Sequence, residues 1–210
     1  MTDWSKIVSS QSPLEKVQLI IQAESSKEDE AIPYLISALG DNTDYTGEAE
    51  DPSFPEPVSS FALSALVKLN GQQAIAQIKV LLKETSNRKL RFDYILALVR
   101  LKGLTLSEAK EVFPKSDDGL MDYAGLLASI RNVEELVKLG LDSSLSSKVR
   151  TQALYCLSMY LLRVLNDENS PLEEKKWARG VFKSVGLNPI YDMVNGWYHL
   201  PKKFSKEWNV

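Results

Sequence analysis

Hydrophobic residues recur along most of this chain with the spacing of α-helices. Within 58–69 the apolar positions follow a three-four-three-four spacing, which places them on one face of a helix. The stretches 74–82 and 90–101 show the same spacing, and Asn70-Gly71 interrupts the pattern between the first two. No stretch alternates apolar and polar residues as a half-buried strand would. The pattern therefore predicts an all-α protein.

Residues typical of helix ends punctuate this periodicity. Ser12-Pro13-Leu14-Glu15 combines a capping serine, a proline suited to the first helical position and a nearby glutamate, and the same tetrapeptide recurs at 170–173. Two further pairs have the spacing of a helix start: Thr105 with Glu108, and Asn132 with Glu135. Four glycines follow periodic runs and predict helix ends at which a residue adopts a positive φ: Gly40, Gly103, Gly140 and Gly186.

The chain also repeats itself. Residues 58–71 align without gaps with residues 90–103, and five positions are identical. Weaker copies begin at Leu120 and Val149, so that successive copies start 32, 30 and 29 residues apart. A helix pair of this length cannot bury its apolar face alone, because it has too little surface to enclose a core. The repeat therefore predicts helix pairs that stack on their neighbours.

Several segments contain parts of one pattern: a Val-Arg start, a ladder of small residues and leucines, a glycine turn, and a second helix that opens with Ala-Ile-Pro-x-Leu. These segments are 30–41, 58–82, 90–103 and 149–157. In these features the chain resembles the HEAT-repeat α-solenoids, in particular their short-repeat branch, which is named after phycobilisome lyases. Arg91 and Arg150 stand at the family's arginine position, where other copies have Ser59 and Met121. Recognisable copies cover about residues 28–165.

The repeat and the resemblance together predict one HEAT-like domain over 1–210, an α-solenoid of about five helix pairs. We expect the first pair over 13–39 and the others to start near residues 57, 88, 119 and 147. An acidic, proline-rich loop at 41–57 would interrupt the repeat. The C-terminal cap and aromatic tail over 170–210, including a helix from residue 171 and a short one over 189–195, would replace the missing neighbour of the last pair.

The loop at 41–57 is a candidate partner-binding element, because long loops inside a compact domain often carry function. Its candidate contacts combine acidic groups with aromatic anchors: Asp44, Tyr45, Glu48, Glu50, Asp51 and Phe54. The alternative is a solvated insertion between repeats. The acidic residues lack the spacing of an EF-hand loop, so the sequence predicts no calcium site.

Two other surfaces are candidates for binding a partner. The second helices of such solenoids line the concave face, which makes Gln73 and Gln77 candidate contacts. The tail at 195–210 places Trp197, Tyr198 and Trp208 among lysines, and aromatic residues beside cations are typical of interfaces. Alternatively, the tail folds back and covers the apolar edge of the last helix pair.

A basic cluster formed by Arg88, Lys89 and Arg91 could bind an anion or a nucleic-acid backbone. Some HEAT-like solenoids are DNA-repair glycosylases that hold the duplex on a basic concave surface. Arg91, however, also has a structural interpretation as the arginine of the repeat. The second helices mix lysines with acidic and amide side chains, so DNA binding is disfavoured.

Residues that would support catalysis or metal binding are scarce. The chain has one cysteine, Cys156, and one histidine, His199, which excludes an intrachain disulfide and a Cys/His zinc cluster. Cys156 aligns with Ala65 and Ala97, so we expect a small buried core thiol rather than a nucleophile. Phosphate-binding glycine motifs are absent. The sequence predicts no catalytic residue, no metal site and no cofactor.

Composition and charge narrow the class of protein further. The net charge of −3 excludes a strongly basic nucleic-acid binder, and a hydrophobic fraction of 44% excludes a disordered chain. Residues 1–60 carry 12 acidic residues and three lysines, a net charge of −9, whereas the remainder carries +6. This asymmetry is suited to steered docking of a partner or to head-to-tail association. Without an apolar run of membrane-spanning length or a leader-like start, we expect a cytoplasmic protein.

The leading functional hypothesis is a non-catalytic scaffold or adaptor that binds another protein through its concave face, the acidic loop or the aromatic tail. The resemblance implies an alternative, a phycobilin lyase-type or lyase-accessory protein that handles a phycobiliprotein subunit or a bilin. DNA alkylation repair is a third and weaker alternative.

Overall fold

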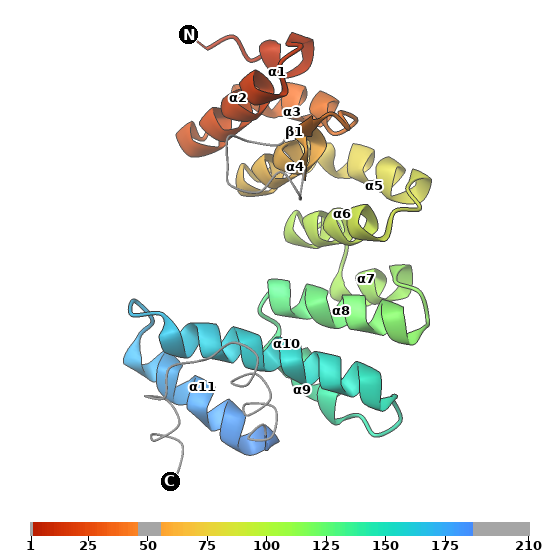
Figure 1. The fold of residues 1–210 in the computed structure, drawn as a ribbon, viewed down its shortest axis with the longest axis vertical. Coiled ribbons are helices and arrows are strands. Elements are labelled where there is room, and N and C mark those ends of the chain that lie inside the picture. Colours follow the sequence, from red (N-terminus) through yellow and green to blue (C-terminus); the bar gives the residue numbers. More distant parts are fainter. Residues whose placement is uncertain (1, 46–55, 187–210) are drawn as a thin grey trace. The chain divides into compact units, whose positions relative to one another are not determined.

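The computed structural model describes residues 2–45 and 56–186, and within these ranges the protein is all-α (Figure 1). The helices are α1 (Lys6–Ser9), α2 (Pro13–Ser26), α3 (Ile32–Ala38), α4 (Val58–Lys68), α5 (Ile75–Glu84), α6 (Arg88–Arg100), α7 (Leu106–Val112), α8 (Asp117–Ser129), α9 (Val133–Leu141), α10 (Ser147–Asn166) and α11 (Leu172–Val185). The short 3-10 turns η1 (Asp29–Ala31) and η2 (Gln72–Ala74) lead into α3 and α5. The all-α prediction is confirmed. The expected short helix over 189–195 lies outside the described residues.

The chain divides into two compact units, Met1–Ala109 and Lys110–Val210, and the boundary falls within α7. In the first unit, α4 packs against α2, α3 and α6, and α5 packs against α6. Large side chains with almost no exposed surface form the core of this unit: Ile7, Ile20, Leu35, Leu39, Leu66, Ile78, Ile95, Leu98 and Leu101.

In the second unit, α10 is the central helix and packs against α8, α9 and α11 (Figure 1). Its core is formed by apolar residues from all four helices: Leu126, Leu127, Leu136, Ala153, Leu157, Leu161 and Phe182. The 20 residues of α10 make it long enough to contact all three neighbours.

Capping side chains place most helix starts where the sequence predicts them. Ser12 Oγ accepts a hydrogen bond from the Glu15 amide at 3.3 Å, and Pro13 is the first residue of α2. Thr105 and Glu108 form the reciprocal capping box at the start of α7. The second Ser-Pro-Leu-Glu segment behaves differently, because α11 begins at Leu172 without a side-chain cap.

Four helices end in the same way. One is α2, where Lys27 has a positive φ and the Glu28 amide donates to the Ala23 carbonyl. The other three belong to the sequence repeat. The residue after the last turn has a positive φ at Asn70, Lys102 and Arg131, and these positions are 32 and 29 residues apart. The next residue then donates its amide to a carbonyl five residues back: Gly71 to Leu66, Gly103 to Leu98, and Asn132 to Leu127. The backbone geometry of these helix ends therefore recurs with the period of the sequence repeat.

The expected positive φ at the four predicted glycines is found only at Gly186. Gly140 lies inside α9, where an added Cβ would stand 2.5 Å from Leu154 Cδ2. At Gly103 a Cβ would stand 2.9 Å from Ile75 Cγ2. Close approach between helices, rather than left-handed backbone, explains these two glycines.

The base of the 41–57 segment is held by a short antiparallel pair that the sequence pattern did not predict. In β1 (Asp44–Tyr45) and β2 (Glu56–Pro57), Asp44 is opposite Pro57 and Tyr45 is opposite Glu56. The Tyr45 ring also packs edge-on against Phe61 of α4, with 5.6 Å between ring centroids. The two ends of the segment are thereby joined to the start of α4.

Candidate partner-binding groove

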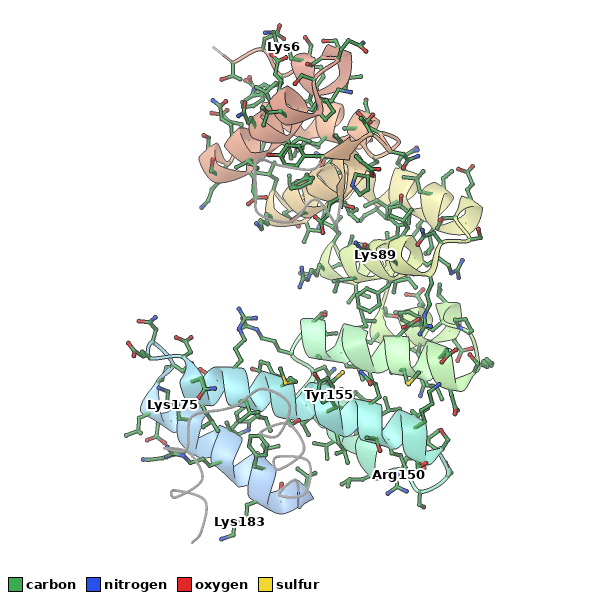
Figure 2. All side chains as sticks on the ribbon, viewed as in Figure 1. Lys6, Lys89, Arg150, Tyr155, Lys175 and Lys183 are labelled. Atoms are coloured by element: carbon green, nitrogen blue, oxygen red, sulfur yellow. The ribbon has the colours of Figure 1, made fainter. Side chains whose placement is uncertain are left out.

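A groove of about 650 Å³ lies between α8 and α10 in the second unit. Its lining residues come from these two helices: Gly125, Ala128, Ser129, Tyr155, Cys156, Met159, Tyr160, Leu162, Arg163 and Asn166. Figure 2 shows all described side chains of the unit and labels Tyr155 on α10. A volume of this size lies within the range of known ligand pockets.

The α10 wall is a continuous helical stripe of large side chains. Tyr155, Met159 and Leu162 follow a four-three spacing, which aligns them along one face of the helix. Met159 is 36% exposed, whereas Leu157 and Leu161 on the opposite side are buried in the core. Leu162 is only 7% exposed and contributes to the core as well, so among the described residues of this wall Met159 is the exposed large apolar side chain.

The side chains of the α8 wall extend only a short way into the groove, because the residues are small. Gly125 has no side chain, Ala128 adds a methyl group, and Ser129 Oγ donates a hydrogen bond to the Gly125 carbonyl at 2.9 Å. The serine hydroxyl is thus satisfied within its own helix. A molecule in the groove can approach the α8 backbone closely.

Arg163 and Asn166 give one end of the groove a polar character. Arg163 is the only charged residue among the ten described lining residues, and its side chain is exposed. Asp167 is four residues further along, but its carboxylate accepts hydrogen bonds from Asn169 and Ser170 in the following turn. The guanidinium therefore adds positive charge to an otherwise uncharged surface.

Cys156 is half-buried in the groove wall, which corrects the prediction of a buried core thiol. The aligned residues Ala65 and Ala97 are buried, but at the corresponding position on α10 the thiol lies at the groove edge. Burial raises the pKa of the Cys156 thiol, although a hydrogen bond from Gln152 Nε2 opposes this effect. The protonated thiol is a poor nucleophile at neutral pH.

A second, smaller groove of about 260 Å³ lies between α4 and α6 in the first unit. Charged and hydroxyl groups dominate its lining: Glu56, Ser60, Leu63, Ser64, Val67, Lys89, Asp93, Leu96, Ala97 and Arg100. Burial raises the pKa of the Asp93 carboxyl, which Lys89 opposes and Glu56 reinforces. When the copies beginning at Leu90 and Val149 are aligned, Arg100 of this groove corresponds to Met159 of the other.

The structure places only some of the predicted contact residues. Asp44 is exposed in β1, and Tyr45 is half-buried against Phe61. Gln73 in η2 and Gln77 in α5 are both exposed. The remaining candidates lie outside the described residues: Glu48, Glu50, Asp51, Phe54, Trp197, Tyr198 and Trp208.

The repeat arginines have a structural role. Arg91 Nη1 donates a hydrogen bond to the Leu82 carbonyl at 3.4 Å, and Arg150 Nε donates to the Gly140 carbonyl at 3.3 Å. Both acceptors lie in the last turn of the preceding helix, where carbonyls lack intrahelical partners. This supports the structural interpretation of Arg91 that the sequence left open.

Sequence reasoning missed Tyr155, Met159 and Arg163. The repeat held a signal for one of them, because Met159 stands where another copy of the repeat has Arg100. Over residues 2–45 and 56–186, no three His, Cys, Asp or Glu side chains are grouped as a metal site would require. In the same ranges, no helix has both the length and the apolar character needed to cross a membrane.

No protein-family model matches the sequence, and no curated protein matches it significantly. Among solved structures, the chain is similar to the complex of CpcE and CpcF of phycocyanin lyase from Nostoc sp. PCC7120, with 17% sequence identity and a TM-score of 0.46. The match covers 87% of this chain and 75% of that chain.

Proposed function

We propose that this protein is a HEAT-like helical-repeat scaffold without a catalytic centre of its own, and that it binds a partner protein through the α8–α10 groove. The observation that carries this proposal is the exposed Met159 in the wall of the groove on α10. Met159 is 36% exposed at a position where another copy of the repeat has Arg100, so folding does not require an apolar residue there. Exposed apolar surface in a groove is typical of interaction sites.

Repeated backbone geometry supports the HEAT-like part of the proposal. The left-handed residues at Asn70, Lys102 and Arg131 recur with the period of the sequence repeat. Arg91 and Arg150 make equivalent hydrogen bonds to the preceding helix. These features fit a single repeat domain over 1–210 with about five helix pairs.

We propose the other predicted surfaces as additional contacts. Gln73 in η2 and Gln77 in α5 are both exposed, as residues that contact a partner must be. The acidic loop at 41–57 and the tail at 195–210 are proposed as further contacts with a cytoplasmic protein partner. Nucleic acid is disfavoured, since Arg91 is engaged with its own fold.

A photo-reactive phenylalanine analogue at position 159 is expected to form a discrete adduct with one protein in cells that express the gene natively. The same analogue at Val80, which is 46% exposed on α5, is the matched control and is expected to give no such adduct. Adducts should be identified by gel shift and mass spectrometry. Equal labelling from both positions, or no adduct from position 159, would contradict the proposed groove.

A second candidate function is bilin handling, which the sequence resemblance implies. The groove volume of about 650 Å³ is large enough for a ligand of that size. This alternative predicts that mixing the protein with a linear tetrapyrrole shifts the visible absorption band, and that Met159→Glu weakens the shift. An unchanged spectrum at high protein concentration would rule out the alternative while leaving the scaffold proposal intact.

A further inference from the structure

We infer that the α8–α10 groove takes an amphipathic helix of about three turns, with an apolar face on α10 and a carboxylate beside Arg163. This inference rests on the proposed function and specifies the chemistry of the partner. It follows from the backbone, the dimensions, the anchor residues and the charge of the groove.

The backbone of the groove walls favours a helical occupant. Every lining residue belongs to α8 or α10 and lies beyond the first turn, so its amide bonds within the helix. An extended peptide would gain no main-chain hydrogen bonds from such walls, in contrast to a peptide added to a sheet edge. A helix satisfies its own backbone groups and needs only an apolar face to bind.

The dimensions of the groove set the length of the occupant. The lining on α10 runs from Tyr155 to Asn166, which corresponds to about 16 Å along a helix axis, or about three turns. On α8, Gly125 and Ala128 allow the axis of a third helix to come close. Close packing over small residues is compatible with interaxial distances of about 8 Å.

The anchor residues are suited to an apolar helix face. Met159 is flexible and polarizable, and such side chains adapt to varied partners. Tyr155 and Tyr160 are half-buried and add aromatic surface, which is enriched among residues that dominate binding energy. Together they supply adaptable apolar contacts along the length of the groove.

The charge of the groove determines the polar end of the occupant. Arg163 stands at the end nearest Asn166, and it is the only charged side chain among the ten described lining residues. A carboxylate on the incoming helix would meet this single cation, whereas a lysine would be repelled. The groove therefore favours a helix whose apolar face carries an acidic residue at the end that lies beside Arg163.

Synthetic peptides test the inference directly. Fluorescein-labelled 18-residue helices would share one Leu/Met stripe and carry a glutamate pair at each end, or a lysine pair at each end. A third peptide would carry the glutamates and a central proline that breaks the helix. With the full chain, we expect fluorescence anisotropy to show the acidic helix binding about tenfold more tightly than either of the others.

Charge reversal supplies the control. Arg163→Glu is expected to remove the preference for the acidic helix, whereas Lys183→Glu, at an exposed position on α11, should leave it unchanged. Equal binding of the acidic and lysine peptides, equal binding of the proline peptide, or binding by none of them would overturn the inference. The cross-linking experiment at position 159 tests the scaffold function independently of these peptides. A protein adduct there would support the scaffold function even if the peptide results overturned the inference.

Discussion

Replacement of Gly119 by alanine is expected to destabilise the second unit by about 3 kcal/mol, because the new methyl group would overlap backbone atoms. A Cβ on Gly119 would lie 2.0 Å from the Pro114 carbonyl oxygen and 2.8 Å from its carbon. Backbone atoms cannot rotate away as a side chain can, so the turn before α8 would have to move. Urea unfolding should show a lower midpoint with an unchanged slope.

Gly180→Ala is the matched control for this substitution. Gly180 also lies within a helix, α11, but no neighbouring atom stands within 4 Å of the position that its new methyl group would occupy. Alanine has the higher helix propensity, so this variant is expected to gain up to about 1 kcal/mol. If the two variants lost stability equally, steric overlap with Pro114 would not be the cause.

Helix starts could be predicted from the sequence because their determinants are local. Ser12 and Asn132 cap the helices that follow them through bonds to residues only three positions away. Such bonds depend on the order of residues and on little else. The periodicity of apolar residues likewise reports the face that will be buried, whatever it packs against.

Glycine roles could not be predicted in the same way, because they depend on distant neighbours. Gly140 follows a periodic run and therefore suggested a helix end, yet its small size is required by Leu154 on the next helix. The left-handed position in the repeat falls one residue before Gly71 and Gly103, at Asn70 and Lys102. Only the packed structure distinguishes left-handed backbone from close approach.

The groove could not be predicted from the sequence either, because it is formed by two helices that are separated in the sequence. Cys156 aligns with two buried alanines, and the alignment alone predicts burial. The thiol is instead half-buried, in the wall of the groove that α10 forms with α8. In contrast, the recurrence of Arg91 and Arg150 in the sequence offered a structural interpretation of Arg91, and the equivalent hydrogen bonds of the two arginines support it.

Substitution of Lys16 by methionine is expected to destabilise the first unit by about 2 kcal/mol at pH 7, because it leaves the Asp41 carboxylate partly buried without its cation. Lys16 Nζ lies 2.6 Å from Asp41 Oδ2, and the two side chains are only 12% and 16% exposed. The pair joins α2 to the segment before β1. Chemical unfolding of the full chain, followed by circular dichroism, measures the effect.

The cost of Lys16→Met should decrease on acidification. Burial raises the pKa of Asp41, but hydrogen bonds from Lys16 and Thr43 and the lysine charge outweigh it, so the pKa lies below its ordinary value of 3.8. A carboxyl whose pKa is lowered by folding stabilises the protein above its unfolded pKa, and this contribution is lost as pH falls through the folded pKa. At pH 3 the variant should therefore approach the wild type more closely than at pH 7.

Lys148→Met is the control for the buried pair. Lys148 Nζ lies 3.1 Å from Asp118 Oδ1, but both side chains are more than half exposed, so water and salt already screen the pair. Its removal should leave the unfolding midpoint almost unchanged at either pH. A loss equal to that of Lys16→Met, or a cost of Lys16→Met that does not change with pH, would show that burial of Asp41 is not what makes its lysine important.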